Sequence, residues 1–143
     1  HTNDAATALT RLIDLGIERF LLASSLRGVL AQRLVRCLCT VCRRPAAATA
    51  LERELLGQAC PERLWAPVGC PVCNGLGYSG RTGIYELVAA DEQLTALIHD
   101  GASEAELRSQ AERDGSRSLR MDGLRLLADG TTSLEELLRV SED

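Results

Sequence analysis

The sequence predicts an α/β chain that is mostly helical, with a metal-binding subdomain inserted between two strands and a helical bundle at the C-terminal end. Three observations lead to this fold class. Two Cys-x-x-Cys pairs stand 27 intervening residues apart, apolar and polar residues alternate on either side of them, and apolar residues recur at helical spacing over residues 91–143. We therefore expect a small core that a metal site reinforces.

The composition is that of a globular protein with few large side chains for its core. The 143 residues are 45% hydrophobic and 25% charged, and only 3% are aromatic. A core of Leu, Val, Ile and Ala is thin, and metal binding compensates because its free energy becomes folding free energy. The net charge of −4 argues against a nucleic-acid-binding protein, although Arg33, Arg36, Arg43 and Arg44 form a local basic run.

No segment reaches the ~20 apolar residues of a membrane span, and no signal-peptide pattern occurs. We therefore expect reduced cysteines, as in a cytosol.

Residues 5–15 carry apolar side chains at helical spacing. Asn3 or Asp4 is positioned to cap this helix, and Gly16 to end it. Because nothing precedes residue 1 to bury the start of the helix, we expect the chain to begin inside a larger domain. A second helix is predicted from Phe20 to near Gly28.

Residues 29–36 alternate as a strand, although a helix continuing to Arg36 is the alternative. Residues 81–88 alternate in the same way, and we expect them to pair antiparallel with 29–36. The cysteine pairs would then lie at the tip of a long hairpin.

The insert between the cysteine pairs is predicted to contain one helix over residues 46–57, followed by turns at Pro61 and Pro67. Trp65, the sole tryptophan, is interpreted as a core residue beside the metal, with a partner-docking anchor as the alternative. Glycines such as Gly75 and Gly77 follow the second pair, where they bring backbone N–H groups close to the sulfurs.

The remaining segment is predicted to be helical throughout. Asp91 caps a helix that reaches Ile98, and the Ser103–Glu106 capping box starts another that ends at Gly115. Residues 119–127 form an amphipathic helix, and Thr132 or Ser133 caps the last helix.

Cys39, Cys42, Cys70 and Cys73 are the predicted metal ligands, because two Cys-x-x-Cys turns can present four thiolates to one tetrahedral Zn²⁺. A site with no open position is structural, so this zinc has no catalytic role. A rubredoxin-like iron site and disulfide or redox chemistry are the alternatives. Cys37 and Cys60 fit neither pair, and Cys37 is close enough to compete as a ligand.

The motifs offer little chemistry beyond the metal. Residues 70–77 fit Cys-x-x-Cys-x-Gly-x-Gly, the repeat of DnaJ-type chaperones, but it occurs here once and indicates a shared turn geometry. No GxxxxGK[ST] phosphate-binding loop and no Ser/His/Asp arrangement occurs, so the chain alone should catalyse nothing.

Three stretches together resemble the type II secretion ATPases, the general secretory pathway protein E family, with the type IV pilus assembly ATPases as relatives. His-Thr-Asn-Asp-Ala at residues 1–5 is similar to the family's histidine box. Residues 21–36 followed by Cys39 resemble the segment before its tetracysteine, and residues 69–87 resemble the segment after it. The resemblance covers the chain in order. Thr40, where a proline is usual, and Cys37, where a basic residue is usual, depart from the pattern.

The resemblance implies the C-terminal part of a RecA-like hexameric ATPase, which binds ATP and Mg²⁺ and powers pseudopilus assembly. The parent would be cytoplasmic, peripheral at the inner membrane, and docked on platform proteins there, with its Walker loops upstream. The implied divisions are the end of the nucleotide domain (1–36), the zinc subdomain (37–80), a returning strand (81–90) and a C-terminal helical subdomain (91–143).

The resemblance also implies roles for two residues. His1 would lie near the γ-phosphate and sense the nucleotide, with a leftover tag residue as the alternative. Arg81 would reach toward the bound nucleotide, with a surface arginine that stabilises a turn as the alternative. A type IV pilus assembly ATPase, or a non-enzymatic zinc-clipped interaction module, remains a rival function for the whole chain.

Overall fold

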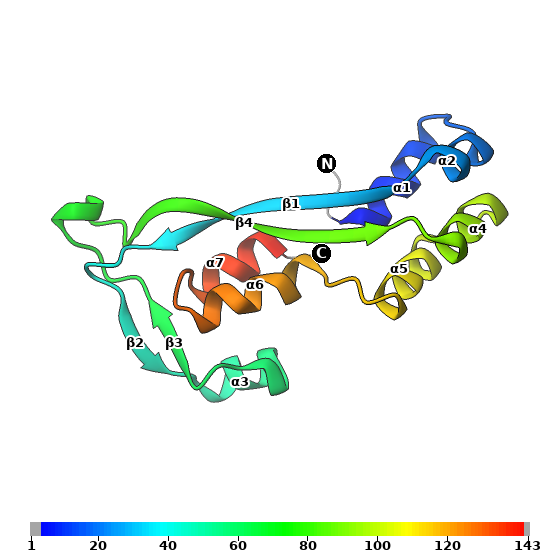
Figure 1. Cartoon of the computed structure of the whole chain (residues 1–143). Helices are drawn as coiled ribbons and strands as arrows, with labels where there is room; N and C mark the ends of the chain where they lie inside the picture. The colour runs from blue at the N-terminus through cyan, green and yellow to red at the C-terminus, as the bar shows by residue number, and fades with distance from the viewer. Residues whose placement is uncertain (1–3, 142–143) are drawn as a thin grey trace. The chain divides into compact units, whose positions relative to one another are not determined.

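A long antiparallel hairpin connects the parts of the chain. In the computed structural model, which describes residues 4–141, β1 (Gly28–Leu38) and β4 (Tyr78–Ala89) pair as a two-stranded sheet and run in opposite directions (Figure 1). The predicted strand pairing is confirmed, and the alternative helix through Arg36 is wrong. Alternation explains the outcome, since Leu30 and Leu34 are exposed while Val35, on the opposite face, is buried.

The chain divides into two units, each assembled from segments distant in sequence. The first unit comprises residues 4–32 and 85–119, and the second comprises residues 33–84 and 120–141. Both strands of the hairpin contribute residues to each unit.

The first unit packs four helices around an aliphatic core: α1 (Ala5–Asp14), α2 (Arg19–Ser25), α4 (Glu92–Asp100) and α5 (Glu104–Arg113). The core contains small and branched side chains, as the scarcity of aromatic residues predicts. Its buried members are Ala5, Ala6, Leu9, Leu22, Ala23, Val88, Leu94, Ile98, Leu107 and Ala111.

Helix starts in this unit follow their sequence signals. The carboxylate of Asp4 accepts a bond of 2.7 Å from the Thr7 N–H, so Asp4 caps α1. Asp91 caps α4, and Ser103 and Glu106 form the predicted capping box of α5. These caps satisfy N–H groups that the helices themselves leave without a partner.

Leu9→Ala should destabilise the first unit by about 2–5 kcal/mol, because it leaves a cavity in the core. Leu9 is 1% exposed, whereas Leu15, just after the same helix, is 72% exposed. We expect Leu15→Ala to change stability little. Urea unfolding followed by circular dichroism measures both, and equal effects of the two substitutions would contradict this core.

The second unit contains a short ribbon that the sequence did not predict. β2 (Arg44–Ala47) pairs antiparallel with β3 (Arg63–Ala66), with Pro45 opposite Trp65. Proline and alanine are poor strand formers, so no local signal marks β2. The predicted helix over residues 46–57 is correspondingly shorter, because α3 (Ala50–Leu56) starts at a Thr49 capping box and is followed by η1 (Gly57–Ala59).

The C-terminal helices are shared between the units. α4 and α5 belong to the first unit, whereas α6 (Leu119–Ala128) and α7 (Leu134–Ser141) lie essentially within the second. The helices expected over residues 91–143 are present, and they are divided between the two units. Helical spacing identifies an apolar face, but it does not say which part of the chain covers that face.

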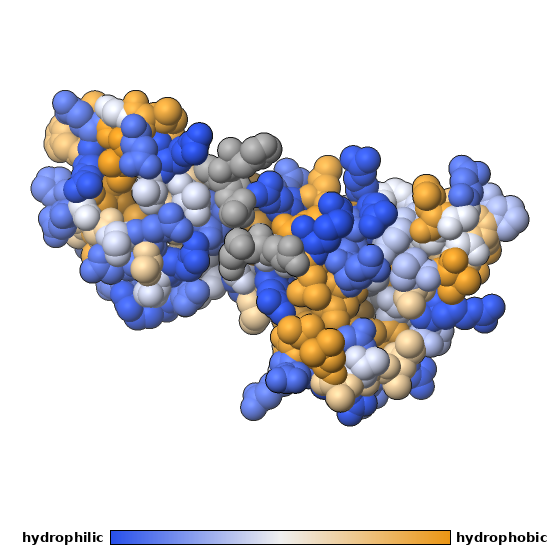
Figure 2. All heavy atoms as spheres, turned by 180° about the vertical axis from the view of Figure 1, so that it is seen from behind, coloured by the Kyte–Doolittle hydropathy of each residue, from blue (hydrophilic) through white to orange (hydrophobic). Residues whose placement is uncertain are grey.

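Exposed aliphatic residues remain on the surface, and Figure 2 shows hydrophobic patches among hydrophilic residues on the face seen from behind. Within residues 4–141, no helix is both long and apolar enough to cross a membrane.

Candidate metal centre

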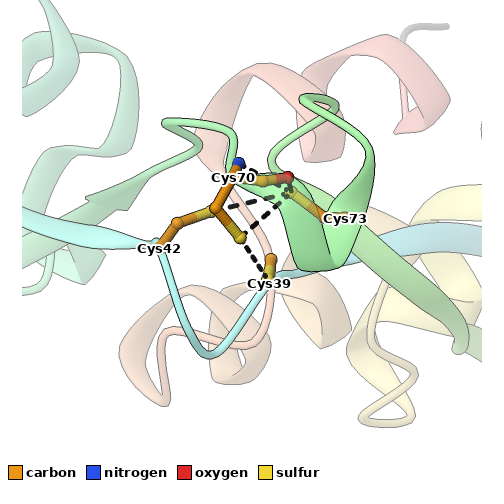
Figure 3. Close-up of side chains that lie close together, drawn as sticks. All are labelled: Cys39, Cys42, Cys70 and Cys73. Carbon is orange, nitrogen blue, oxygen red and sulfur yellow. Dashed lines mark hydrogen bonds between the residues drawn. The ribbon is translucent and has the colours of Figure 1, made fainter.

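The four predicted cysteine ligands come together in the second unit. The sulfur atoms of Cys39, Cys42, Cys70 and Cys73 all lie within 4.8 Å of one another (Figure 3). The Sγ–Sγ distances are 3.9 Å for Cys39–Cys70, 3.8 Å for Cys42–Cys73 and 3.7 Å for Cys70–Cys73. The spacing of the two Cys-x-x-Cys pairs therefore identified a real cluster.

These distances suit a single tetrahedral ion. A Zn–S bond of about 2.3 Å places the sulfurs of a regular tetrahedron about 3.8 Å apart. A disulfide would need a sulfur separation of about 2.05 Å, and all four thiols are free. The donor set and its spacing thus fit Zn²⁺, and they leave no room for a disulfide in this arrangement.

Each cysteine pair closes a tight turn, which we call a knuckle. In the first knuckle, residues 39–42, the Cys42 N–H donates to the Cys39 carbonyl at 3.2 Å. In the second, residues 70–73, which includes η2 (Pro71–Cys73), the Cys73 N–H donates to the Cys70 carbonyl, also at 3.2 Å. The two turns are equivalent, and each directs two sulfurs toward the same point.

Backbone N–H groups donate to two of the four sulfurs. Cys73 accepts bonds of 3.2 Å from the N–H groups of Cys70 and Gly77, and Cys42 accepts one of 3.3 Å from Gly69. Burial raises the pKa of the Cys73 thiol, but the two N–H donors outweigh it and lower that pKa to about 6. Burial raises the pKa of Cys42, which has a single N–H donor and neighbouring thiols.

Two positions near the cysteines require glycine, because neighbouring atoms leave no room for a Cβ. A Cβ at Gly77 would lie 2.5 Å from Cβ of Pro67, and one at Gly69 would lie 2.5 Å from the carbonyl oxygen of Gly75. Both glycines also have positive φ. The role of Gly77 agrees with the expectation for glycines after the second knuckle. Gly69 was not predicted as a donor, and its position just before Cys70 was the available signal.

The other candidate residues that the structure describes lie outside this cluster. Among residues 4–141, Cys37 and Cys60 do not join the group of four sulfurs. The competing-ligand interpretation of Cys37 therefore finds no support. Arg81 is an exposed residue of β4. His1 lies outside the described residues.

A buried carboxylate forms a second polar centre that sequence analysis missed. The side chain of Glu136 is fully buried and accepts from the Arg36 backbone N–H at 2.9 Å. The guanidinium groups of Arg36 and Arg139 each donate to it at distances down to 2.7 Å. Burial raises the pKa of Glu136, but the bonds from Arg139 and Arg36 outweigh it and lower that pKa to about 2.

The Glu136 cluster continues toward the knuckles. The Arg36 guanidinium lies 4.1 Å from the ring centroid of Tyr78, whose hydroxyl is 2.7 Å from Oγ of Ser133. Only the spacing of Glu136 and Arg139 on one helix was visible in the sequence. Arg36 is 100 positions away, and nothing local connects it to them.

Comparison with known proteins gives consistent matches. The family described as "Type II/IV secretion system protein" matches residues 1–139. The chain is 52% identical over 143 residues to the type II secretion system protein HxcR of Pseudomonas aeruginosa and 50% identical over 145 residues to that organism's type II secretion system protein E. It is 46% identical over 144 residues to the type IV pilus assembly ATPase TfpB of Acinetobacter baylyi.

These alignments cover 100%, 100% and 98% of this chain. They cover only 27%, 29% and 25% of the respective relatives. The chain therefore spans roughly a quarter of the length of these curated relatives.

Proposed function

We propose that this chain, which belongs to the type II/IV secretion system protein family, is the C-terminal part of the ATPase that powers type II protein secretion. The observation that carries the proposal is the identity of 52% and 50%, over the whole chain, to two type II secretion proteins. The four-cysteine cluster supports it, because the family resemblance implies a tetracysteine at these positions.

The metal centre has a structural role in this proposal. Cys39, Cys42, Cys70 and Cys73 would hold one Zn²⁺, which supplies a cross-link between the two knuckles. The residues of the chain do the remaining work: the N–H groups of Gly69 and Gly77 orient and stabilise the sulfurs. With all positions around the ion taken by sulfur, no substrate has access to the metal.

The whole protein would carry the catalytic parts. In this proposal it contains a RecA-like domain that binds ATP and Mg²⁺, of which residues 1–36 and 81–90 are the end and a returning strand. His1 would sense the nucleotide, and Arg81, which is exposed, would reach toward it. A name of one relative, "Type II secretion system ATPase E" of Vibrio cholerae, supports the ATPase assignment.

The proposed setting follows from the same family. The whole protein would assemble as a hexamer in the cytoplasm, peripheral at the inner membrane, and dock on platform proteins of the secretion system. The net charge of −4 supports a protein partner over a nucleic acid.

A type IV pilus assembly ATPase is the second candidate, favoured by the 46% identity to TfpB. Deleting the gene for the whole protein from its own host separates the two. We expect the deletion to stop secretion of type II substrates and to leave surface pili intact. Loss of pili with normal secretion would overturn the type II assignment in favour of the pilus ATPase.

An ATP hydrolysis assay distinguishes the two ATPase proposals from the non-enzymatic interaction module. The purified whole protein should hydrolyse ATP, whereas residues 1–143 alone, which lack a GxxxxGK[ST] loop, should not. A whole protein that binds zinc but hydrolyses no ATP in any assembly state would favour the interaction module.

A further inference from the structure

We propose that the turn between α6 and α7 (residues 129–133) holds the two cysteine knuckles in position, so that metal affinity depends on this turn. The contact between Trp65 and Gly130 couples the turn to the metal site. The inference rests on the metal site proposed above and is independent of the ATPase role. Every residue involved belongs to the second unit.

The turn contacts both flanks of the first knuckle. Before it, the Leu38 N–H donates to the carbonyl oxygen of Thr131 at 2.7 Å. After it, the Arg43 guanidinium donates to the carbonyl oxygen of Gly130. The first pair of ligands is therefore held between two hydrogen bonds to consecutive residues of the turn.

The same turn reaches the second knuckle through Tyr78. The Tyr78 hydroxyl is 2.7 Å from Oγ of Ser133, and both residues are buried. Tyr78 directly follows Gly77, whose N–H donates to the Cys73 sulfur. Displacement of the turn would therefore move the Gly77 N–H away from the Cys73 sulfur.

Trp65 packs against the turn at Gly130. A Cβ at Gly130 would lie 2.5 Å from Nε1 and 2.6 Å from Cδ1 of Trp65, so the indole rests directly on the glycine. On the Trp65 ring lies the Arg43 guanidinium, whose Cζ is 4.5 Å from the ring centroid. Since Trp65 precedes Cys70 by five positions, this contact connects the turn to the segment entering the second knuckle.

Coupling of this kind acts in both directions. If the turn keeps the sulfurs arranged for the ion, metal binding must stabilise the turn by the same free energy. Groups outside the ligand set commonly change metal affinity by about 10–100-fold when they are removed. The turn acts here as such an outer support, although it lies more than fifty positions beyond the last cysteine.

The chain offers a matched pair of glycines for the test. Gly130 and Gly115 both follow an aspartate at a helix end, have positive φ, and donate their N–H to the carbonyl three residues earlier. An alanine at Gly115 would meet nothing within 4 Å, whereas one at Gly130 collides with Trp65. The two substitutions carry similar backbone strain and differ in the indole contact.

Zn²⁺ affinity of the 143-residue chain is measured by competition with a chelator for the wild type, Gly130→Ala and Gly115→Ala. We expect Gly130→Ala to weaken affinity by about tenfold or more and Gly115→Ala to stay within about twofold of the wild type. As the reciprocal readout, added Zn²⁺ should slow amide hydrogen exchange in residues 126–136 of the wild type and leave residues 101–115 unchanged.

Arg43→Ala tests the same contact without a collision, which covers the case in which Gly130→Ala does not fold. It removes the ring contact and the bond to Gly130, and we expect a weaker loss of affinity in the same direction. Wild-type affinity in Arg43→Ala, or equal affinities in the two glycine variants, would overturn the coupling while leaving the metal site intact. A wild-type chain that binds no Zn²⁺ would overturn both.

Discussion

Cys73→Ser should reduce the metal content of the protein from about one Zn²⁺ per chain to a small fraction of that, with affinity lowered more than about a hundredfold. Cys73 accepts two backbone N–H bonds, which lower the pKa of its thiol to about 6 and so favour the thiolate form that binds zinc. A serine hydroxyl keeps its proton under these conditions and is a poor zinc ligand. The three remaining thiolates cannot complete a tetrahedron.

The loss should extend to folding of the second unit, because metal binding free energy in a structural site is also folding free energy. Elemental analysis of the purified protein measures metal content, and circular dichroism measures the fold. Cys60→Ser is the control, since Cys60 is a half-buried cysteine outside the cluster, and its sulfur contacts only the neighbouring Pro61 carbonyl among the bonds described. Loss of metal from Cys60→Ser with retention in Cys73→Ser would refute the ligand assignment.

Glu136→Gln should destabilise the second unit by about 2–3 kcal/mol at neutral pH. A carboxyl whose pKa falls from about 4.3 in the unfolded chain to about 2 in the folded protein contributes about 3 kcal/mol to folding. The solvent exposure of Arg36 and Arg139 reduces the expected effect somewhat. Glutamine preserves the size of the side chain but gives up the charge that both guanidinium groups bind.

The same substitution has a definite pH dependence. Because folding lowers the pKa of Glu136, its contribution is fully present above about pH 4.3 and is lost as the pH falls toward 2. The difference in stability between wild type and Glu136→Gln should therefore shrink over that interval. Both proteins carry the same metal site, so release of Zn²⁺ in acid acts on both and cancels in the difference between their stabilities.

Fluorescence of Trp65, the sole tryptophan, follows unfolding of the unit that contains Glu136. The control is Glu135→Gln, which changes the exposed neighbour on the same helix and should leave stability within about 0.5 kcal/mol. If Glu136→Gln matched this control at neutral pH, the buried ion cluster would not stabilise the fold.

Sequence reasoning succeeded where a signal is local. The caps at Asp4, Asp91 and Ser103 lie at the helix starts because a side chain and the N–H groups it accepts from are three residues apart. The cysteine pairs were found for the same reason, since each knuckle is a single turn. The alternation of residues 29–36 identified β1, although the strand extends further at both ends.

Sequence reasoning failed where partners are distant or propensity is weak. The β2 strand contains Pro45 and alanines, and it exists because β3 pairs with it. The division of the C-terminal helices between units depends on contacts such as that of Arg36 with Glu136, which no periodicity encodes. Trp65 was identified as a packing residue, but its contact with Gly130 requires knowledge of the turn.

The dependence of the second unit on residues 131–136 has a consequence for synthesis on the ribosome. Cys73 precedes Glu136 by 63 positions, so at about 5–20 residues per second the thiols emerge several seconds before the residues that support them. Until then the contacts between the knuckles and residues 131–136 cannot form. Zinc captured at this stage would act as a folding nucleus, and in its absence the six cysteines would be most open to oxidation during translation.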